Sequence, residues 1–438
     1  GYNVAVGFQA GHLMTTGTAN TIIGGLAGDA INSGGNNVLL GYDAGGSLTT
    51  GNENVAIGAY ALKTENAHGF NVAIGYSALE ALDAGANAYN VAIGYKAGEA
   101  MSTGIENTIV GGGAGDALTI GNYNTVLGAF ALGLSVDGDY NTALGYKALQ
   151  DYEDGDGNGH NTAVGAKSQL NASTGEFNTS LGSLSIGDGV ATGNYNTALG
   201  YQSGRDLTSG TENTFIGGHS GMLVSTGTHN VAVGMQTMQN TTVGLYNTAL
   251  GAYAMFTNVD SSKNVAVGYN SLRMLEPASA VDSLNVAVGF EAGKAMTTGV
   301  RNTIMGAMAG DAMTTTSDNV AIGYEALTSA TIGDGNVAIG NHALYTNVAA
   351  DRNIAIGYQA LYLATAASTV DSYNTAIGFQ AADHITSGVQ NTIIGGLAGN
   401  AINTGDNNIV IGYNADTSAV GVDNETVIGT ATTTNAIV

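Results

Sequence analysis

An acidic, glycine-rich insertion is the segment whose residue types and spacing best suit ligand chemistry. Asp154, Asp156 and Asn158 alternate with glycine and precede Gly159, which matches the D-x-D-x-N-G opening of a calcium-binding loop. Their side-chain oxygens are ligands that a hard cation prefers. However, Gly165 occupies the position of the bidentate Glu that completes such a loop. Two interpretations therefore stay open, a calcium site and a solvated loop, and we favour the loop.

No other group of residues has the spacing of a catalytic or cofactor-binding site. The sequence contains no glycine-rich phosphate loop that ends in Lys-Ser or Lys-Thr, and no nucleophile elbow. The seven histidines are scattered, without metal-ligand spacing, and we expect them on the surface or in loops: His12, His68, His160, His219, His229, His342 and His384. These observations predict a protein that is not an enzyme and that, calcium aside, holds no cofactor.

The elements that would position such residues come from a short repeat. Each copy reads Asn, a β-branched residue, any residue, an aliphatic residue and Gly, as in Asn3–Gly7 and Asn20–Gly24. Of the 24 intervals between successive repeat glycines, 19 are 17 residues long and five are 18 to 21. So regular a period indicates a stacked repeat architecture, in which function is spread along a surface.

One copy predicts the structure of one coil. Val91 and Ile93 alternate with Asn90 and Ala92, so we expect a short strand with one apolar face. A second apolar stretch, such as Ala78-Leu79, precedes a Thr-Gly or Ser-Gly turn. Two short strands and two glycine-marked turns per copy predict an all-β fold, a parallel β-solenoid of about 25 coils with a 17-residue period.

Three columns of equivalent residues recur through the coils. The residue after the Asn is Thr in 13 copies, Val in ten and Ile in two, which suits a pleated, half-buried surface. The Asn column predicts a ladder of amide hydrogen bonds with a structural and not a catalytic role. The residue three positions after the Gly is always Ala, Ser or Thr. Because such a coil buries little apolar area by itself, we infer a homo-oligomer in which small-residue columns let neighbouring chains approach closely.

Aromatic residues form a further column. A Tyr or Phe directly follows the repeat Gly in 12 copies: Phe8, Tyr42, Tyr76, Tyr95, Tyr146, Tyr201, Tyr269, Phe290, Tyr324, Tyr358, Phe379 and Tyr413. An exposed aromatic ladder can stack against sugar rings, whereas a covered one packs between coils or between chains. We favour packing.

The coils group into longer blocks. Similar coils begin at residues 1, 89, 195, 284 and 373, which predicts tandem duplication into the blocks 1–88, 89–194, 195–283, 284–372 and 373–438. Residues 1–438 are therefore expected to form a single elongated repeat domain. Since the first residues already lie inside a repeat, we expect terminal domains to be missing.

The amino-acid composition limits the kinds of partner that the chain can bind. The chain has 34 acidic and ten basic residues, a net charge of −24, so it would repel the phosphates of nucleic acids. No apolar run approaches the roughly 18 residues that span a bilayer, and no membrane insertion is expected. There is no Cys, so disulfides contribute nothing. An acidic, solvated surface favours an extracellular location.

The repeat resembles the head domains of trimeric autotransporter adhesins and, more closely, the repeat regions of bacteriophage tail fibres. Asn141–Leu149, which reads Asn-Thr-Ala-Leu-Gly-Tyr-Lys-Ala-Leu, carries the resemblance. Residues 407–413 and 422–429 look like the end of such a region. The resemblance implies a left-handed parallel β-roll assembled as a trimer, located in a virion tail fibre or on a cell surface.

These observations lead to one main functional hypothesis and three alternatives. The main hypothesis is a structural and adhesive fibre, the shaft or receptor-contacting region of a phage tail fibre, with a host surface glycan or protein as receptor. The alternative is a cellular surface adhesin or extracellular filament. Less favoured are an ice-binding solenoid, because Thr-x-aliphatic columns form an array, and a polysaccharide depolymerase, for which no paired carboxylates stand out.

Overall fold

The structure is a computed structural model that describes residues 1–153, 158–276, 281–365 and 370–430. It divides into two compact units, Gly1–His219 and Ser220–Val438. The described residues form strands and turns and no helix, so none of them builds an apolar helix of membrane-spanning length.

The first unit contains one three-residue strand per coil. In chain order these are β1 Val4–Val6, β2 Thr21–Ile23, β3 Val38–Leu40, β4 Val55–Ile57, β5 Val72–Ile74, β6 Val91–Ile93, β7 Thr108–Val110, β8 Thr125–Leu127, β9 Thr142–Leu144, β10 Thr162–Val164, β11 Thr179–Leu181, β12 Thr197–Leu199 and β13 Thr214–Ile216.

The second unit repeats this pattern and adds two short strands, β21 Ala350–Asp351 and β23 Val370–Asp371, which pair with each other in parallel. Its strands are β14 Val231–Val233, β15 Thr248–Leu250, β16 Val265–Val267, β17 Val286–Val288, β18 Thr303–Met305, β19 Val320–Ile322, β20 Val337–Ile339, β21 Ala350–Asp351, β22 Ile354–Ile356, β23 Val370–Asp371, β24 Thr375–Ile377, β25 Thr392–Ile394, β26 Ile409–Ile411 and β27 Thr426–Ile428.

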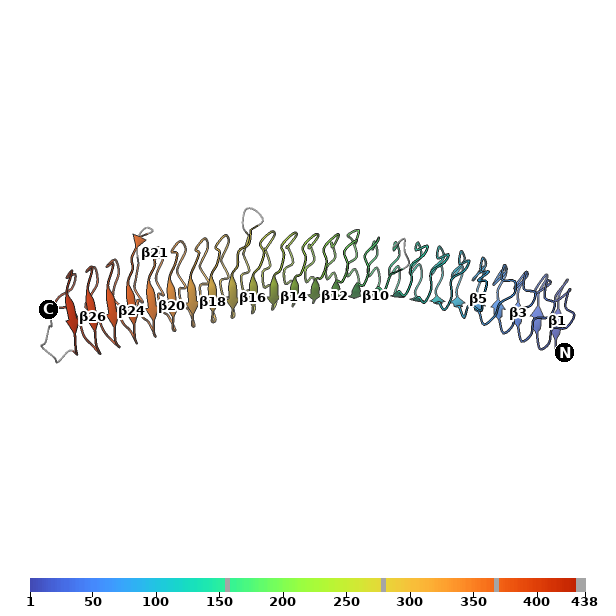
Figure 1. Cartoon of the computed structure of the whole chain (residues 1–438), viewed down its shortest axis with the longest axis horizontal. Coiled ribbons are helices and arrows are strands. Elements are labelled where there is room, and N and C mark those ends of the chain that lie inside the picture. Colours follow the sequence, from blue (N-terminus) through green and yellow to red (C-terminus); the bar gives the residue numbers. More distant parts are fainter. Residues whose placement is uncertain (154–157, 277–280, 366–369, 431–438) are drawn as a thin grey trace. The chain divides into compact units, whose positions relative to one another are not determined.

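Equivalent residues of successive coils pair in register. Strand β6 is parallel to β7, with Val91 opposite Thr108, Ala92 opposite Ile109 and Ile93 opposite Val110. Within each unit the main strands follow one another in this way, and Figure 1 shows their arrows along one side of the coils. The predicted all-β parallel solenoid with a 17-residue period is therefore confirmed.

The prediction of two strands per coil is wrong for most coils. The second apolar stretch is a chain of turns, because its backbone repeatedly enters the left-handed region, with φ of 58° at Lys96 and 60° at Gly98. A strand cannot contain such residues. The stretch is nevertheless bonded to the next coil, since the Gly98 N–H donates to the Ala114 carbonyl at 3.0 Å.

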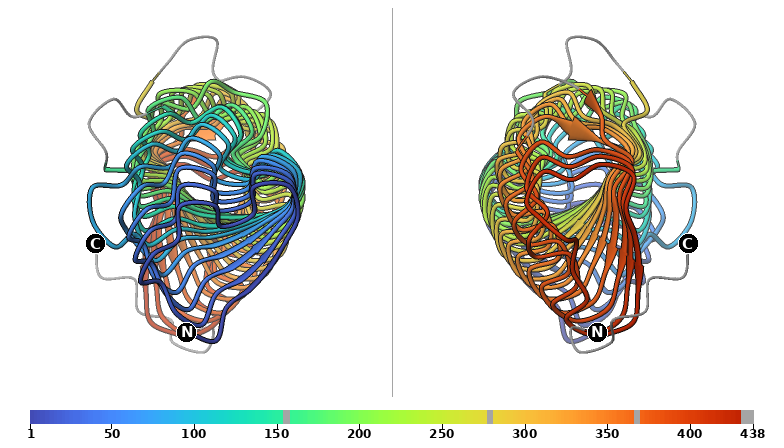
Figure 2. Two further views of the ribbon diagram at one scale, coloured as in Figure 1. Left: turned by 90° about the vertical axis from the view of Figure 1, so that its right-hand side faces the viewer. Right: turned by 90° about the vertical axis from the view of Figure 1, so that its left-hand side faces the viewer.

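The interior of each coil is narrow and lined by alternate strand residues. Asn90 and Ala92 of the β6 coil are fully buried, and so is Ala97, which follows the repeat Gly by three positions. End-on views show the coils of each unit lying over one another (Figure 2). In-register pairing of the strands therefore places equivalent side chains in columns. The small-residue columns therefore fill the inside of the coil. The inference that they lie between chains is wrong.

The buried Asn column joins every described coil within each unit to the next. In the first unit each Asn backbone N–H donates to the Oδ1 of the preceding Asn at 2.9–3.1 Å. The side-chain Nδ2 donates to a turn carbonyl 14 residues later, as from Asn107 to Gly121 at 2.8 Å. The predicted ladder of amide hydrogen bonds is confirmed, and it also includes the Asn backbone N–H groups and the turn carbonyls.

The ladder predicts the effect of removing one amide. Replacing Asn107 by Ala leaves the Asn124 N–H and the Gly121 carbonyl without their partners. We expect Asn107→Ala to lower the free energy of unfolding by about 2 to 5 kcal/mol, since each buried unpaired group costs about 1 to 3 kcal/mol. Denaturant unfolding measures this change. Asn341→Ala is the control, because the Asn341 side chain is exposed; an equal loss in both variants would contradict the ladder's role.

The two neighbouring glycines Gly111 and Gly112 predict opposite outcomes for the same substitution. Gly111 has φ +144°, and a Cβ there would lie 2.5 Å from the Gly128 carbonyl oxygen of the next coil. A Cβ on Gly112 would meet nothing nearer than the Tyr95 oxygen at 4.0 Å. We expect Gly111→Ala to cost at least about 3 kcal/mol or to prevent folding, and Gly112→Ala to melt within a few degrees of the parent. Thermal unfolding followed by circular dichroism distinguishes the two.

Candidate interaction surface

The outward face of the main strands is largely apolar, with Val, Ile, Leu or Met at the third strand position and Thr, Val or Ile at the first. In β6 the middle residue Ala92 points inward, whereas Val91 is half-buried and Ile93 is 37% exposed. The same alternation recurs through both units. The apolar strand face expected from sequence therefore exists, but it faces away from the coil interior.

Large aliphatic side chains line this outward face at the third position of the strands. Several are more than a third exposed: Ile23, Ile93, Leu127 and Leu181 in the first unit, and Leu250, Met305, Ile377 and Ile394 in the second. Single exposed aliphatic residues are ordinary, but a contiguous apolar surface indicates an interaction site. We call these third-position residues, together with the β-branched residues at the first strand positions, the outer sheet face.

Aromatic rings flank the outer sheet face next to the repeat glycines. The residues that directly follow the glycines contact one another between coils, as in Tyr76 and Tyr95 with ring centroids 5.6 Å apart and nearly parallel planes. In some coils that lack a ring at that position the next residue supplies one, as Tyr60 does, which meets Tyr42 and Tyr76 edge to face. Of the two kinds of packing that we favoured from sequence, between coils or between chains, these contacts confirm the packing between coils. Tyr42, Tyr76 and Tyr95 also keep exposed surface.

A second aromatic column, which the sequence analysis missed, precedes the buried Asn residues. Five consecutive coils contribute parallel rings whose centroids are 4.7–5.2 Å apart: Tyr123, Tyr140, His160, Phe177 and Tyr195. This spacing is close to the distance between hydrogen-bonded strands. All five rings are exposed and their backbones have φ between 49° and 60°. The recurrence of a ring directly before Asn was the signal in the sequence.

The residues proposed for calcium are only partly described. Asp154 and Asp156 lie outside the described residues, and Asn158 is exposed. Tyr152, just before this segment, is fully buried. His160, just after it, stacks between Tyr140 and Phe177. The insertion is therefore anchored to the regular coil on both sides.

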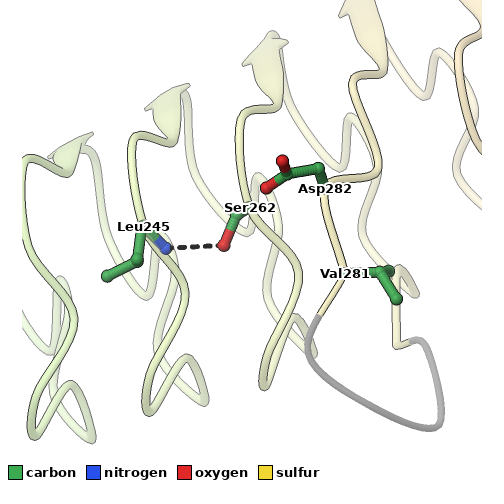
Figure 3. Close-up of a pocket in the computed structure, with 4 residues that line it drawn as sticks. All are labelled: Leu245, Ser262, Val281 and Asp282. Carbon is green, nitrogen blue, oxygen red and sulfur yellow. Dashed lines mark hydrogen bonds between the residues drawn. The ribbon is translucent and has the colours of Figure 1, made fainter.

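A surface hollow of about 460 Å³ lies in the second unit (Figure 3). It is lined by Leu245, Ser262, Val281 and Asp282. The Ser262 hydroxyl oxygen accepts the Leu245 N–H at 3.0 Å, and the Asp282 carboxylate lies 2.6 Å from the Lys263 ammonium group. Because both polar side chains already have partners, we assign no chemistry to this hollow.

Comparison with known proteins does not assign the chain to a family. No protein-family profile and no curated protein sequence matches it. Function must therefore be argued from the surfaces described above.

Two carboxyl groups on the second unit predict opposite responses to pH. Burial raises the pKa of Asp311, so its charge costs stability once the pH rises through that pKa. The hydrogen bond from Arg301 lowers the pKa of Asp318, so its charge adds stability that is lost as the pH falls through that pKa.

We therefore expect Asp311→Asn to raise the melting temperature at pH 7 but not at pH 3. Asp318→Asn lowers it at pH 7, by a small amount because the ion pair is exposed, and this difference shrinks as the pH falls through the lowered pKa of Asp318. Thermal unfolding across this pH range measures both changes. Shifts of the same sign in the two variants at pH 7 would contradict the assignment.

Proposed function

We propose that this chain is part of a structural and adhesive fibre, the shaft or receptor-contacting region of a phage tail fibre, and that it works as a homo-oligomer without catalysis. The proposal places it outside the cell, as part of a virion, with a host surface glycan or protein as receptor. The trimeric state is implied by the resemblance of the repeat to tail fibres and trimeric adhesins.

The outer sheet face supports this proposal most directly. A single chain leaves Leu127 and Leu181 each 51% exposed at equivalent positions of β8 and β11. Burial of apolar surface is the main favourable term in protein association. A second and third copy of the chain match this face in length and period, so identical coils can pack at every level.

The ring columns support adhesion. Tyr123, Tyr140 and Tyr195 recur at a regular spacing and are exposed, and because their faces stack on neighbouring rings it is mainly their edges that reach solvent. A row of exposed ring edges offers apolar contact area that a sugar or a protein side chain of a receptor can cover. The acidic chain, with net charge −24, favours neutral or basic receptors over acidic ones.

A cellular adhesin or filament would have the same fold as a tail fibre. The two differ in whether the chain belongs to a virion or to a cell surface. The genes beside this one decide between the two: tail structural genes support the phage assignment, and a surface-anchoring segment in the same reading frame supports the cellular one.

The outer sheet face also supports an ice-binding function, because Thr and Val side chains recur there in a regular array. Thermal hysteresis of the purified protein would favour this alternative. We prefer an interface between chains, since the third strand position holds large aliphatic residues such as Leu127, Leu250 and Met305.

The oligomer predicts a clear outcome for charges placed on the outer sheet face. The purified chain, 43.7 kDa, is expected to scatter light as a particle of three chains. In the double variant Leu127→Lys/Leu181→Lys, each ammonium group would have to be buried between chains, at a cost of several kcal/mol per ion. We therefore expect this variant to dissociate while its circular dichroism spectrum is unchanged.

The matched control places the same charges away from the strands. Ile120 and Val190 are 51% and 58% exposed and lie in turns of the same unit. The double variant Ile120→Lys/Val190→Lys is expected to keep the parent's mass. A folded monomeric parent, or equal masses for the two double variants, would overturn the proposed assembly.

A further inference from the structure

Three potential metal ligands from two neighbouring coils converge in the first unit. They are Glu65 and His68 in the turn after β4, and Asp83 in the turn after β5. One ligand atom from each lies within 4.8 Å of the other two, and among the described residues this is the only such group of three. The spacing of 18 residues between Glu65 and Asp83 is close to one repeat period, so the stack places them side by side.

Glu65 occupies a core position. Its side chain is 0% exposed, and the equivalent residues in the coils before and after it are Leu48 and Leu82, both fully buried. Transfer of a carboxylate into such an apolar column is costly unless the charge is paired. A Glu at this position therefore requires a partner that its neighbours in the column do not need.

The hydrogen bonds of Glu65 explain its orientation but not its charge. Its Oε1 accepts the His68 backbone N–H at 3.0 Å, and its Oε2 accepts the Ala84 N–H at 3.4 Å. In the second unit Asn258 and Asn347 accept the N–H three residues later in the same way. Since a neutral amide suffices for this turn, the turn by itself does not account for a carboxylate at this position.

The imidazole of His68 completes a pair of convergent ligands. Its Nδ1 lies 3.2 Å from Glu65 Oε1, which is close to the separation of two ligands on a tetrahedral zinc ion, about 3.3 Å for bonds of about 2.0–2.1 Å. The preceding coil has Gly51 at the equivalent position. The His68 side chain is 26% exposed, so water can reach the imidazole.

The charge balance also favours a cation. Glu65 and Asp83 bring two carboxyl groups together, and Lys63, the nearest lysine in the chain sequence, lies 3.5 Å from Asp43 instead. Nitrogen and oxygen ligands in a set of three, with a position left for water, are typical of zinc and similar transition metals. Calcium requires six to eight oxygen atoms, which this cluster does not offer.

We propose that Glu65, His68 and Asp83 bind one divalent transition-metal ion, zinc or a close chemical equivalent, with water as the remaining ligand. The neutral imidazole binds through Nδ1 and keeps its proton on Nε2. Because Asp83 begins the longer turn of a 19-residue interval between the repeat glycines Gly75 and Gly94, the ion ties this turn to the coil before it. The site does not depend on the proposed function.

Calorimetric titration of the full chain, stripped with a chelator, tests the site. We expect one tightly bound Zn²⁺ per chain and no saturable binding of Ca²⁺ in parallel titrations. We also expect the melting temperature to rise with added Zn²⁺, because the ion binds only the folded chain.

Substitutions separate ligand loss from misfolding. Glu65→Leu restores the residue of the neighbouring coils, so we expect it to fold at least as stably as the metal-free parent while losing the zinc site. His68→Gln is expected to abolish binding, and Asp83→Asn to weaken it at least tenfold. His384→Gln is the matched control, because His384 Nδ1 lies 2.8 Å from an Asp383 carboxylate oxygen but outside any described group of three.

Binding that disappears in Glu65→Leu and His68→Gln but persists in His384→Gln supports the site. Absence of stoichiometric Zn²⁺ binding by the parent would overturn it, and so would equal binding by the parent and Glu65→Leu.

Discussion

The whole structure depends on one buried hydrogen bond that is repeated from coil to coil, in which an Asn backbone N–H donates to the side-chain oxygen of the Asn before it. This bond holds equivalent residues of adjacent coils at the same level. It also persists where the repeat is longer, since the Asn90 N–H still reaches Asn71 Oδ1 at 3.1 Å across 19 residues. Extra residues must therefore leave the coil as loops, and the register of everything else is preserved.

Because successive coils pair in register, residues that recur in the sequence form continuous surfaces along the stack. Because equivalent side chains recur at the strand spacing, a ring in one coil stacks on the ring in the next, and an aliphatic residue extends an apolar face. Like charges in such a column would repel, which accounts for a chain with only 10% charged residues. The exceptions are informative: Glu65 is a carboxylate in a column of buried aliphatic residues and has its imidazole partner three residues away.

Much of this fold could be predicted from the period. The parallel stack, the amide ladder and the packing of rings between coils follow from which residues recur 17 positions apart. The second strand of each coil could not be predicted correctly, because Leu79 and Lys96 adopt positive φ, which costs a non-glycine residue roughly 1–2 kcal/mol. Hydrogen bonds to the next coil hold this backbone in place. His68 looked isolated in the sequence because one of its neighbours in the cluster comes from another coil.

The sequence by itself determined the length of the coil and which residues share a column, because the period states both directly. Only the tertiary structure decided which face of each strand points inward. Alternation along a strand has a period of two and is the same for either choice. The Asn90 amide and backbone N–H bond to the neighbouring coils, which places Asn90 inside the coil. Alternation along the strand then points Ala92 inward and Val91 and Ile93 outward. The apolar residues at the first and third strand positions, which the sequence alone would place in the core, therefore lie on the outside of the coil. Another chain can cover them there.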